Sequence, residues 1–276
     1  MIAREKIEIF ENLGFVGGGQ MAEALIKGLL SRELLKPGQI TVSDLSEVRR
    51  SHLKKTFGIN TTSENKEVVK GSEIIILAVK PQVISIVLKE IRPVVSSDRL
   101  VVSIAAGITV HSLEKGLPDD TRVVRVMPNT PAMVQAGAAA LCKGTAARPG
   151  DLDMVRQILE TVGKAVVVPE SLMDAVTGLS GSGPAYVFTF IEGLIEAGVR
   201  EGLPRTIAQE LVVQTVLGAA LMCQNTGKHP AELTTMVTSP GGTTVAGLHV
   251  LERGALRGII LDAVRAATER SRELGS

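Results

Sequence analysis

The chain has 276 residues, of which 45% are hydrophobic and only 2% aromatic, and its net charge is +1. This length allows one large domain or two ordinary ones, and the apolar share excludes a disordered chain. The neutral charge and the scarcity of aromatic residues argue against a nucleic-acid or anionic-lipid surface. Two cysteines and four scattered histidines predict neither a disulfide framework nor a metal site. Because the longest purely apolar runs fall far short of the ~18 residues of a membrane span and no signal peptide opens the chain, we expect a cytoplasmic protein.

The first ~170 residues alternate short apolar runs with amphipathic stretches. Helices are predicted over 20–30 and 46–56, and strands over 13–16, 40–43, 74–79, 100–104 and 123–127. Short, continuously apolar strands that alternate with helices are typical of a parallel sheet in a doubly wound α/β domain.

The pattern becomes helical after residue 168. Helical patterns cover 171–200, with a glycine-rich interruption at 178–184, and then 204–223, 245–251 and 255–274. Pro204 is expected at the first helical position, where proline is favoured. We therefore divide the chain into an α/β domain, residues 1–168, and an all-helical domain, residues 169–276.

One helical segment, residues 211–222, is apolar nearly all round. A helix of this kind requires burial on every side, and about 108 residues of helix cover such faces poorly. We expect a homo-oligomer. A compact monomeric bundle, with this segment as its central helix, is the alternative.

The sequence Gly17-Gly18-Gly19-Gln20-Met21-Ala22 follows the first predicted strand and opens the first helix. It matches G-x-G-x-x-[GA], in which glycines permit a tight turn and close approach to a pyrophosphate at the helix N-terminus. The strand before it and the helix after it favour a dinucleotide site over a glycine-rich turn without a ligand.

The second strand ends at Ser43-Asp44. An acid here binds a ribose 2′-OH and favours NAD, whereas Ser43, Arg49 or Arg50 could meet a 2′-phosphate. The alternative for the arginines, and the expected role of at least one, is a solvated helix face. The sequence leaves NADH and NADPH both open.

Three later strand ends lie where an open α/β sheet binds ligands. They are residues 78–82, 103–107 and 127–131. Lys80 is a candidate acid, phosphate contact or plain surface residue. Asn129 is a candidate partner of a carboxamide or a cap of its own turn.

In the helical domain, Ser239-Pro-Gly-Gly-Thr-Thr244 runs into a helical pattern. Its backbone N–H groups and hydroxyls form a candidate anion site for a small carboxylate, with an ordinary Ser/Thr N-cap as the alternative. The chain shows no nucleophile elbow and no carboxylate pair in these loops, which points to cofactor chemistry assisted by hydroxyls.

Together these segments resemble the pyrroline-5-carboxylate reductase family. The resemblance runs from about residue 13 to 273, through residues 15–22, 78–81, 103–107, 125–130, 178–186, 239–244 and 247–252. It implies an N-terminal Rossmann dinucleotide-binding domain and an all-α dimerisation domain, in dimers that often assemble into larger rings. Met1 to Asn12 look like an extra leader.

The resemblance implies NADPH, with NADH possible, as the cofactor. With Ser43 and Asn129 from the strand ends, the candidate cofactor-binding residues are Val16, Gly17, Gly18, Gly19, Gln20, Met21, Ser43, Asp44, Asn65, Ala78, Val79, Lys80, Pro81, Ala105, Ala106, Gly107 and Asn129. Some family members have a serine where this chain has Asp44, which keeps the cofactor preference open. The candidate substrate-binding residues are Ser239, Gly241, Gly242, Thr243 and Thr244.

The implied reaction is hydride transfer to the cyclic imine 1-pyrroline-5-carboxylate, which gives L-proline. Thr244 is the candidate catalytic residue, orienting or protonating the ring nitrogen, and no strong acid is required because an imine is itself basic. The rivals are a reductase of another cyclic imine, a β-hydroxyacid dehydrogenase and a dinucleotide-sensing regulator. The dehydrogenase motif G-x-G-x-x-x-K is not met, since Val187 stands at the lysine position.

Overall fold

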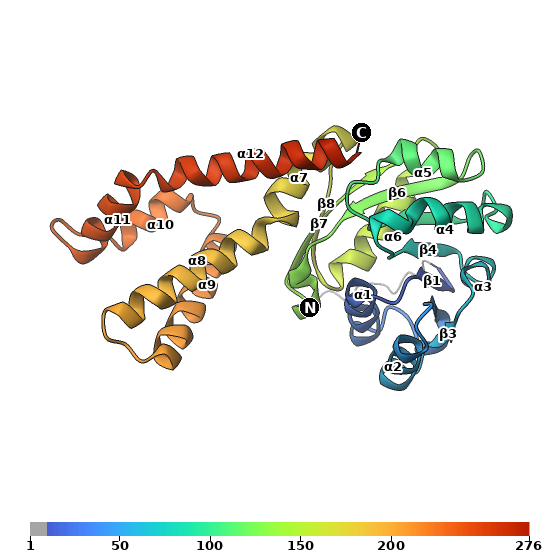
Figure 1. Cartoon of the computed structure of the whole chain (residues 1–276), viewed down its shortest axis with the longest axis horizontal. Helices are drawn as coiled ribbons and strands as arrows, with labels where there is room; N and C mark the ends of the chain where they lie inside the picture. Colours follow the sequence, from blue (N-terminus) through green and yellow to red (C-terminus); the bar gives the residue numbers. More distant parts are fainter. Residues whose placement is uncertain (1–9, 276) are drawn as a thin grey trace. The chain divides into compact units, whose positions relative to one another are not determined.

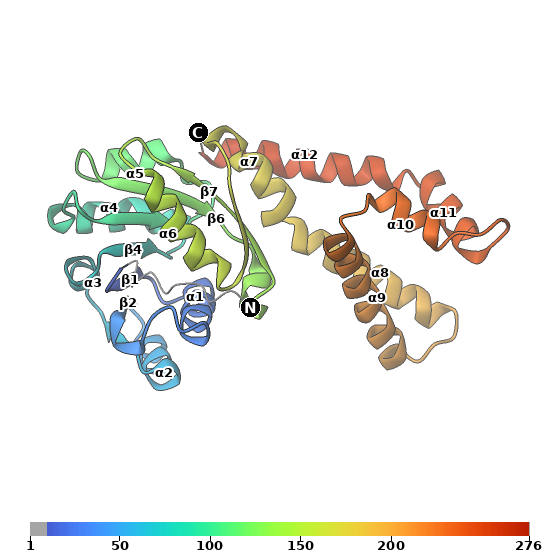
Figure 2. The ribbon, with the colours of Figure 1, turned by 180° about the vertical axis from the view of Figure 1, so that it is seen from behind.

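The computed structural model describes residues 10–275 (Figures 1 and 2). Their contacts form two compact units. The first contains the residues up to Ser182 together with those from Ala267 onward, and the second contains Gly183–Ala266. The first unit is thus an α/β domain to which the end of the last helix returns.

The first unit is built on an eight-stranded sheet of order β3-β2-β1-β4-β5-β6-β7-β8. Neighbouring strands are parallel except for the antiparallel pair β6 and β7. The strands are β1 Leu13–Val16, β2 Ile40–Ser43, β3 Asn60–Thr62, β4 Ile74–Leu77, β5 Leu100–Ser103, β6 Arg122–Met127, β7 Gly137–Lys143 and β8 Gly163–Val167. The predicted doubly wound α/β fold is confirmed.

Two layers of helices cover the sheet. Helices α1 (Gln20–Ser31), α2 (Glu47–Phe57) and α6 (Pro149–Glu160) contribute buried residues to one core, and α1 and α6 lie side by side (Figure 2). Helices α3 (Asn65–Gly71), α4 (Ile84–Ile91) and α5 (Val110–Gly116) pack into the core of the other face. The central strands are therefore buried on both sides, which explains their continuous apolar sequences.

Residues 170–181 continue the first unit in a series of short turns. A 3₁₀ turn, Glu170–Leu172, leads into α7 (Met173–Val176) and then into a π-helical turn, Thr177–Gly181. The glycine-rich interruption predicted at 178–184 is thus a change of helical type rather than a break.

Helices α8 (Gly183–Arg200), α9 (Arg205–Thr226), α10 (Pro230–Met236) and α11 (Thr243–Arg253) lie in the second unit, together with most of α12 (Leu256–Gly275). Helices α8 and α9 pack against each other (Figure 1). The structure places Pro204 at the N-cap of α9, one position before its predicted place. Its ψ of 138° is extended, so its carbonyl accepts the first helical bond, from Ala208 N, at 2.9 Å.

Helix α9 changes the expectation that no segment of the chain is long and apolar enough to span a membrane. By length and composition, α9 could cross a membrane, because its polar residues are mostly uncharged. Its apolar side chains are half-exposed in the single chain, among them Leu211, Val213, Leu217 and Leu221. A large exposed apolar surface marks a contact site for another molecule.

Candidate functional site

The glycine turn links the ends of three strands. Gly17 N donates to the carbonyl of Ser43 at 2.8 Å, and Gly18 N donates to Oδ2 of Asp44 at 2.9 Å. Gly19 is the N-cap of α1, with no side chain to occupy the helix N-terminus. This free helix start is the arrangement that binds a pyrophosphate.

Gly17 needs to be glycine for two reasons. Its φ of +97° is unfavourable for residues with a Cβ, and an added Cβ would lie 2.8 Å from both Ala78 O and Val79 Cγ1. At Gly19, in contrast, an added Cβ would meet nothing within 4 Å. Gly17 therefore lets the turn pack on the end of β4, while Gly19 faces the open space that a ligand could fill.

The turn lies where the strand order reverses. Strand β1 lies between β2 and β4, and Ala78 N donates to the carbonyl of Val16 at 2.8 Å. In open α/β sheets such a switch point forms a crevice outside the carboxyl ends of the strands. The candidate residues Val16–Met21, Ser43–Asp44 and Ala78–Pro81 thus meet at one edge of the sheet.

Asp44 and the following arginines brace this edge. Asp44 accepts hydrogen bonds from Gly18 N and, at 2.8 Å, from Ser46 N. Arg50 donates to the carbonyls of Asp44 and Leu45, at 2.7 and 3.0 Å. The guanidinium of Arg50 therefore lies beside the carboxyl end of β2.

Arg49 contacts the glycine turn itself, because its guanidinium donates to the carbonyls of Gly18 and Gly19. The expectation that at least one of the two arginines only forms a solvated helix face is wrong, since both are bonded to backbone of the site. The sequence could not show the contacts of Arg49, because they join residues 30 and 31 positions apart.

A carboxylate, Glu23, lies in the first turn of α1, close to the predicted phosphate position. Burial pushes its pKa upward, but hydrogen bonds from His52 and Arg49 outweigh burial and hold the pKa below its usual value. The guanidinium of Arg49 compensates this charge, so the helix N-terminus keeps its attraction for an anion.

Ser43 and Asn65 are engaged inside the domain. Ser43 is fully buried and donates to Oδ1 of Asn65 at 2.7 Å, and Asn65 Nδ2 donates to Glu90 at 2.8 Å. This network holds the start of α3 against the end of β2. Both residues lie at the same edge as the glycine turn.

Lys80 and Ala106 are exposed, while Ala105 is buried. Ala105 N donates to the hydroxyl of Ser103 at 3.3 Å. Residues 105–107 follow β5, on the other side of the switch point from Asp44. All three are small residues.

Asn129 is held by two backbone groups. Its Nδ2 donates to the carbonyl of Ser180 at 3.0 Å, and its Oδ1 accepts from Ala138 N at 2.9 Å. These bonds join the end of β6 to β7 and to the π-helical turn, a local geometry often found at functional sites. The contacts within the chain correspond to a bracing role for Asn129.

The candidate substrate residues lie in the second unit. Gly241 has a φ of +70°, and Gly242 N donates to the carbonyl of Ser239 at 2.9 Å. Gly242 is the N-cap of α11 and no side chain caps it, so the alternative of an ordinary Ser/Thr N-cap is wrong. Thr243 and Thr244 open the helix, so this loop presents a second helix N-terminus.

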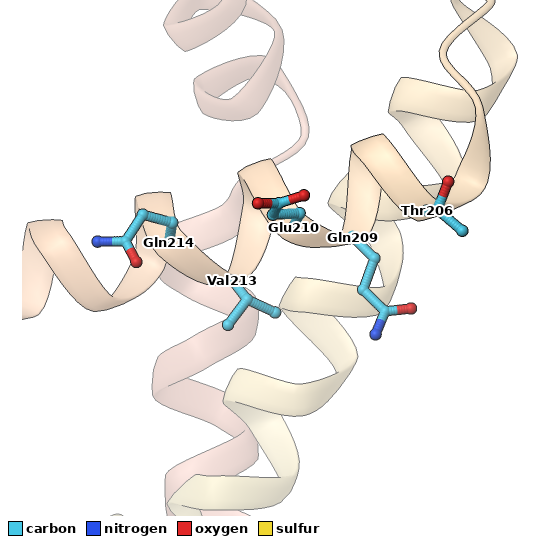
Figure 3. Close-up of a pocket in the computed structure, with 5 residues that line it drawn as sticks. All are labelled: Thr206, Gln209, Glu210, Val213 and Gln214. Atoms are coloured by element: carbon cyan, nitrogen blue, oxygen red, sulfur yellow. The ribbon is translucent and has the colours of Figure 1, made fainter.

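The surface also has an open hollow of about 480 Å³ on α9. Figure 3 shows its lining side chains, which all come from one helix and do not converge: Thr206, Gln209, Glu210, Val213 and Gln214. None is a candidate site residue. Within residues 10–275 no three His, Cys, Asp or Glu side chains are grouped as metal ligands.

Two family models match the chain. Residues 170–274 match the model described as pyrroline-5-carboxylate reductase dimerisation, and residues 12–107 match NADP oxidoreductase, coenzyme F420-dependent. The first begins at the turn that follows β8, and the second covers the strands on both sides of the switch point.

Several curated relatives are similar over nearly their whole length. The pyrroline-5-carboxylate reductase of Methanosarcina acetivorans is 47% identical, over 96% of this chain and 98% of the relative. That of Arabidopsis thaliana is 46% identical, over 95% of each chain.

Solved structures of pyrroline-5-carboxylate reductases are also similar to this chain over nearly its whole length. The pyrroline-5-carboxylate reductase of Coxiella burnetii has a TM-score of 0.92 at 37% identity, covering 97% of this chain and 99% of that one. The pyrroline carboxylate reductase of Plasmodium falciparum, crystallised with NADP bound, has a TM-score of 0.86 at 35% identity, covering 96% and 98%.

Proposed function

Because the chain belongs to the pyrroline-5-carboxylate reductase family, we propose that it reduces 1-pyrroline-5-carboxylate to L-proline with a nicotinamide cofactor. It is an oxidoreductase of proline biosynthesis. The observation that carries this assignment is the similarity to pyrroline-5-carboxylate reductases over nearly the full length of the chain. This similarity covers both the domain with the glycine turn and the dimerisation domain.

The residues of the first unit fit a dinucleotide. The free N-terminus of α1 and the open space at Gly19 suit a pyrophosphate, and Val16–Met21 would hold it there. Asp44 would face the adenosine ribose, and the buried Ser43 would support this position through its bond to Asn65. Ala78–Pro81, Ala105–Gly107 and Asn129 would line the remaining length of the crevice. When bound, the nicotinamide supplies the hydride.

For the cofactor we propose NADPH, with NADH as a possible second donor. Arg49 and Arg50 lie at the end of β2, where a 2′-phosphate would need a cation, and the carboxylate of Asp44 already accepts two backbone N–H groups. The NADP named with the Plasmodium falciparum structure supports the same cofactor.

For the substrate we propose the loop that contains Ser239, Gly241, Gly242 and Thr243. Its backbone N–H groups would hold the carboxylate at the start of α11, where a helix favours negative charge. Thr244 would orient the ring nitrogen or pass it a proton. Correct positioning would supply most of the rate enhancement.

The dimerisation domain identifies the chain as a homo-oligomer. We propose that a second copy, rather than a membrane, covers the apolar side chains of α9, and that dimers assemble further into rings in the cytoplasm. We also propose residues 1–168 as the dinucleotide-binding domain and 169–276 as the dimerisation and substrate domain. The family match from residue 170 supports this division, whereas the contacts within the chain group the residues up to Ser182 and those from Ala267 onward with the first unit.

The proposed function is tested by following cofactor absorbance with pyrroline-5-carboxylate and either NADPH or NADH. Parallel reactions use the six-membered cyclic imine and, in reverse, a β-hydroxyacid with oxidised cofactor. Preferred turnover of the five-membered imine supports the proposal. Preferred turnover of the other imine or of the hydroxyacid would overturn it.

A further inference from the structure

An ion pair joins β6 to the turn that follows β8, with one partner buried and the other, Glu170, partly exposed. Arg125 of β6 is only 4% exposed, and its guanidinium donates to Oε1 of Glu170 at 3.1 Å. A buried guanidinium is costly unless a carboxylate compensates it. None of the proposed cofactor or substrate contacts uses either residue.

The same carboxylate oxygen holds the start of α5. Val110 N donates to Oε1 of Glu170 at 2.7 Å, and Val110 is the first residue of that helix. The first N–H groups of a helix have no partner within it, so an outside carboxylate fixes their position. Glu170 therefore ties together β6, α5 and its own turn.

Glu170 also affects the pKa of a neighbouring thiol, that of Cys142. Cys142 of β7 lies directly opposite Arg125 in the sheet. Burial, and then the negative charge of Glu170, raise the pKa of the Cys142 thiol to about 11. Glu170 therefore lies close enough to Cys142 to affect the electrostatics of this corner of the domain.

Between β5 and α5 lies the loop Ala105–Gly107. On one side its neighbour Val110 is bonded to Glu170. On the other side a Cβ added to Gly107 would lie 3.6 Å from Cβ of Leu274, near the end of α12. Besides the bond from Ala105 N to Ser103, the bond from Val110 to Glu170 therefore fixes the chain three residues after the loop.

The position of this loop indicates which part of the cofactor it would meet. The glycine turn and Asp44 lie at the ends of β1 and β2, whereas the loop lies at the end of β5, across the switch point. A dinucleotide that lies across this crevice with its adenosine at β2 has its nicotinamide toward β5.

We propose that Glu170, held in place by Arg125, is a positioning residue that fixes the loop Ala105–Gly107 against the nicotinamide end of the cofactor. This inference rests on the proposed reductase function and deepens it. It predicts that loss of the Glu170 carboxylate impairs hydride transfer without any contact between Glu170 and the substrate.

The test is the Glu170→Gln variant of the full-length enzyme, with pyrroline-5-carboxylate and NADPH. We expect kcat to fall about tenfold or more, since small misplacements of reacting groups are costly. The kinetic isotope effect with NADPH deuterated at the transferred hydrogen should rise, because hydride transfer becomes more rate-limiting. An isotope effect does not depend on the fraction of folded enzyme, so a merely structural defect leaves it unchanged.

Two further variants keep the test decisive if Glu170→Gln folds poorly. The double variant Arg125→Met/Glu170→Gln removes the buried cation together with its partner, which preserves folding better than leaving the guanidinium buried alone, and it should show the same raised isotope effect. Arg125→Lys, which keeps a cation beside Glu170, should retain more activity than Arg125→Met.

The matched control is Asp153→Asn, which removes the exposed ion pair with Arg156 on α6. Its kinetics should equal those of the wild type. An unchanged kcat and isotope effect in Glu170→Gln and in the double variant would overturn the positioning role, while wild-type turnover in the same assay leaves the proposed function standing. A wild-type enzyme without imine turnover would overturn the proposed function and this inference together.

Discussion

Replacing Gly17 with alanine should destabilise the fold, whereas the same change at Gly19 should not. At Gly17 the φ of +97° is strained for alanine, and the new methyl would lie 2.8 Å from the carbonyl oxygen of Ala78. That oxygen belongs to the backbone at the end of β4, so it cannot rotate away. Gly19 has a φ of −65° and open space around it.

The two effects at Gly17 can be sized. A positive φ costs a residue with a Cβ about 1–2 kcal/mol, and overpacking a tight contact costs about 1–3 kcal/mol. The sum, about 2–5 kcal/mol, is a large part of the ~5–15 kcal/mol that stabilises a typical protein. At ~2–4 °C per kcal/mol for a domain of this size, the Tm should fall by about 4–20 °C. Gly19→Ala should cost less than about 1 kcal/mol, the difference between glycine and alanine at an N-cap.

The assay is thermal unfolding of both variants without cofactor, at one protein concentration, followed by titration with NADPH. Gly17→Ala should melt well below the wild type. Gly19→Ala should melt near it but bind NADPH about tenfold or more weakly, because its methyl occupies the proposed phosphate space. Equal Tm values for the two variants would refute the locked turn, and wild-type affinity in Gly19→Ala would refute the phosphate position.

Three further outcomes are expected. Thr244→Ala should lower kcat/KM about tenfold to a hundredfold while Thr244→Ser retains most activity, and a wild-type kcat/KM in the alanine variant would exclude its role at the ring nitrogen. Asp44→Ser should raise the ratio of kcat/KM for NADPH over NADH about fivefold, since one nearby charge contributes ~1 kcal/mol, and an unchanged ratio would contradict the ribose position. The Cys142 thiol keeps its proton to about pH 11, whereas the unfolded chain releases it near 9.0, so the free energy of unfolding should fall across this range by roughly 2–3 kcal/mol. The free energy of unfolding, measured by chemical denaturation as a function of pH, should fall less steeply in Cys142→Ala than in the wild type. Equal slopes in the two proteins would show that the Cys142 thiol does not cause the fall.

The strands illustrate which parts of the fold the sequence predicts. Strands β1, β2, β4, β5 and β6 are central and apolar, and the structure places each within two residues of its predicted bounds. Strand β3, Asn60–Thr62, was not predicted because its three residues are polar. Strand β7, with its run of alanines, was not predicted because its antiparallel pairing with β6 is a non-local contact.

The candidate site likewise has features that the sequence predicts and features that it does not. The glycine turn follows from the local sequence, because a strand, three glycines and a helix specify one geometry. The bonds from Arg49 to that turn do not, and neither does the pairing of Arg125 with Glu170. Charged residues give the same local signal whether they lie in solvent or bridge distant segments.

By itself, then, the sequence determined the order of the two domains, the glycine turn and the resemblance to a reductase family, because each depends on short segments whose periodicity or motif is complete. Only the tertiary structure decided that Asp44 and Arg49 brace the glycine turn, that Asn129 holds the π-helical turn, and that Glu170 fixes the start of α5. These contacts depend on which strand ends become neighbours in the sheet. That order is set by the burial of the whole core, which no single segment encodes.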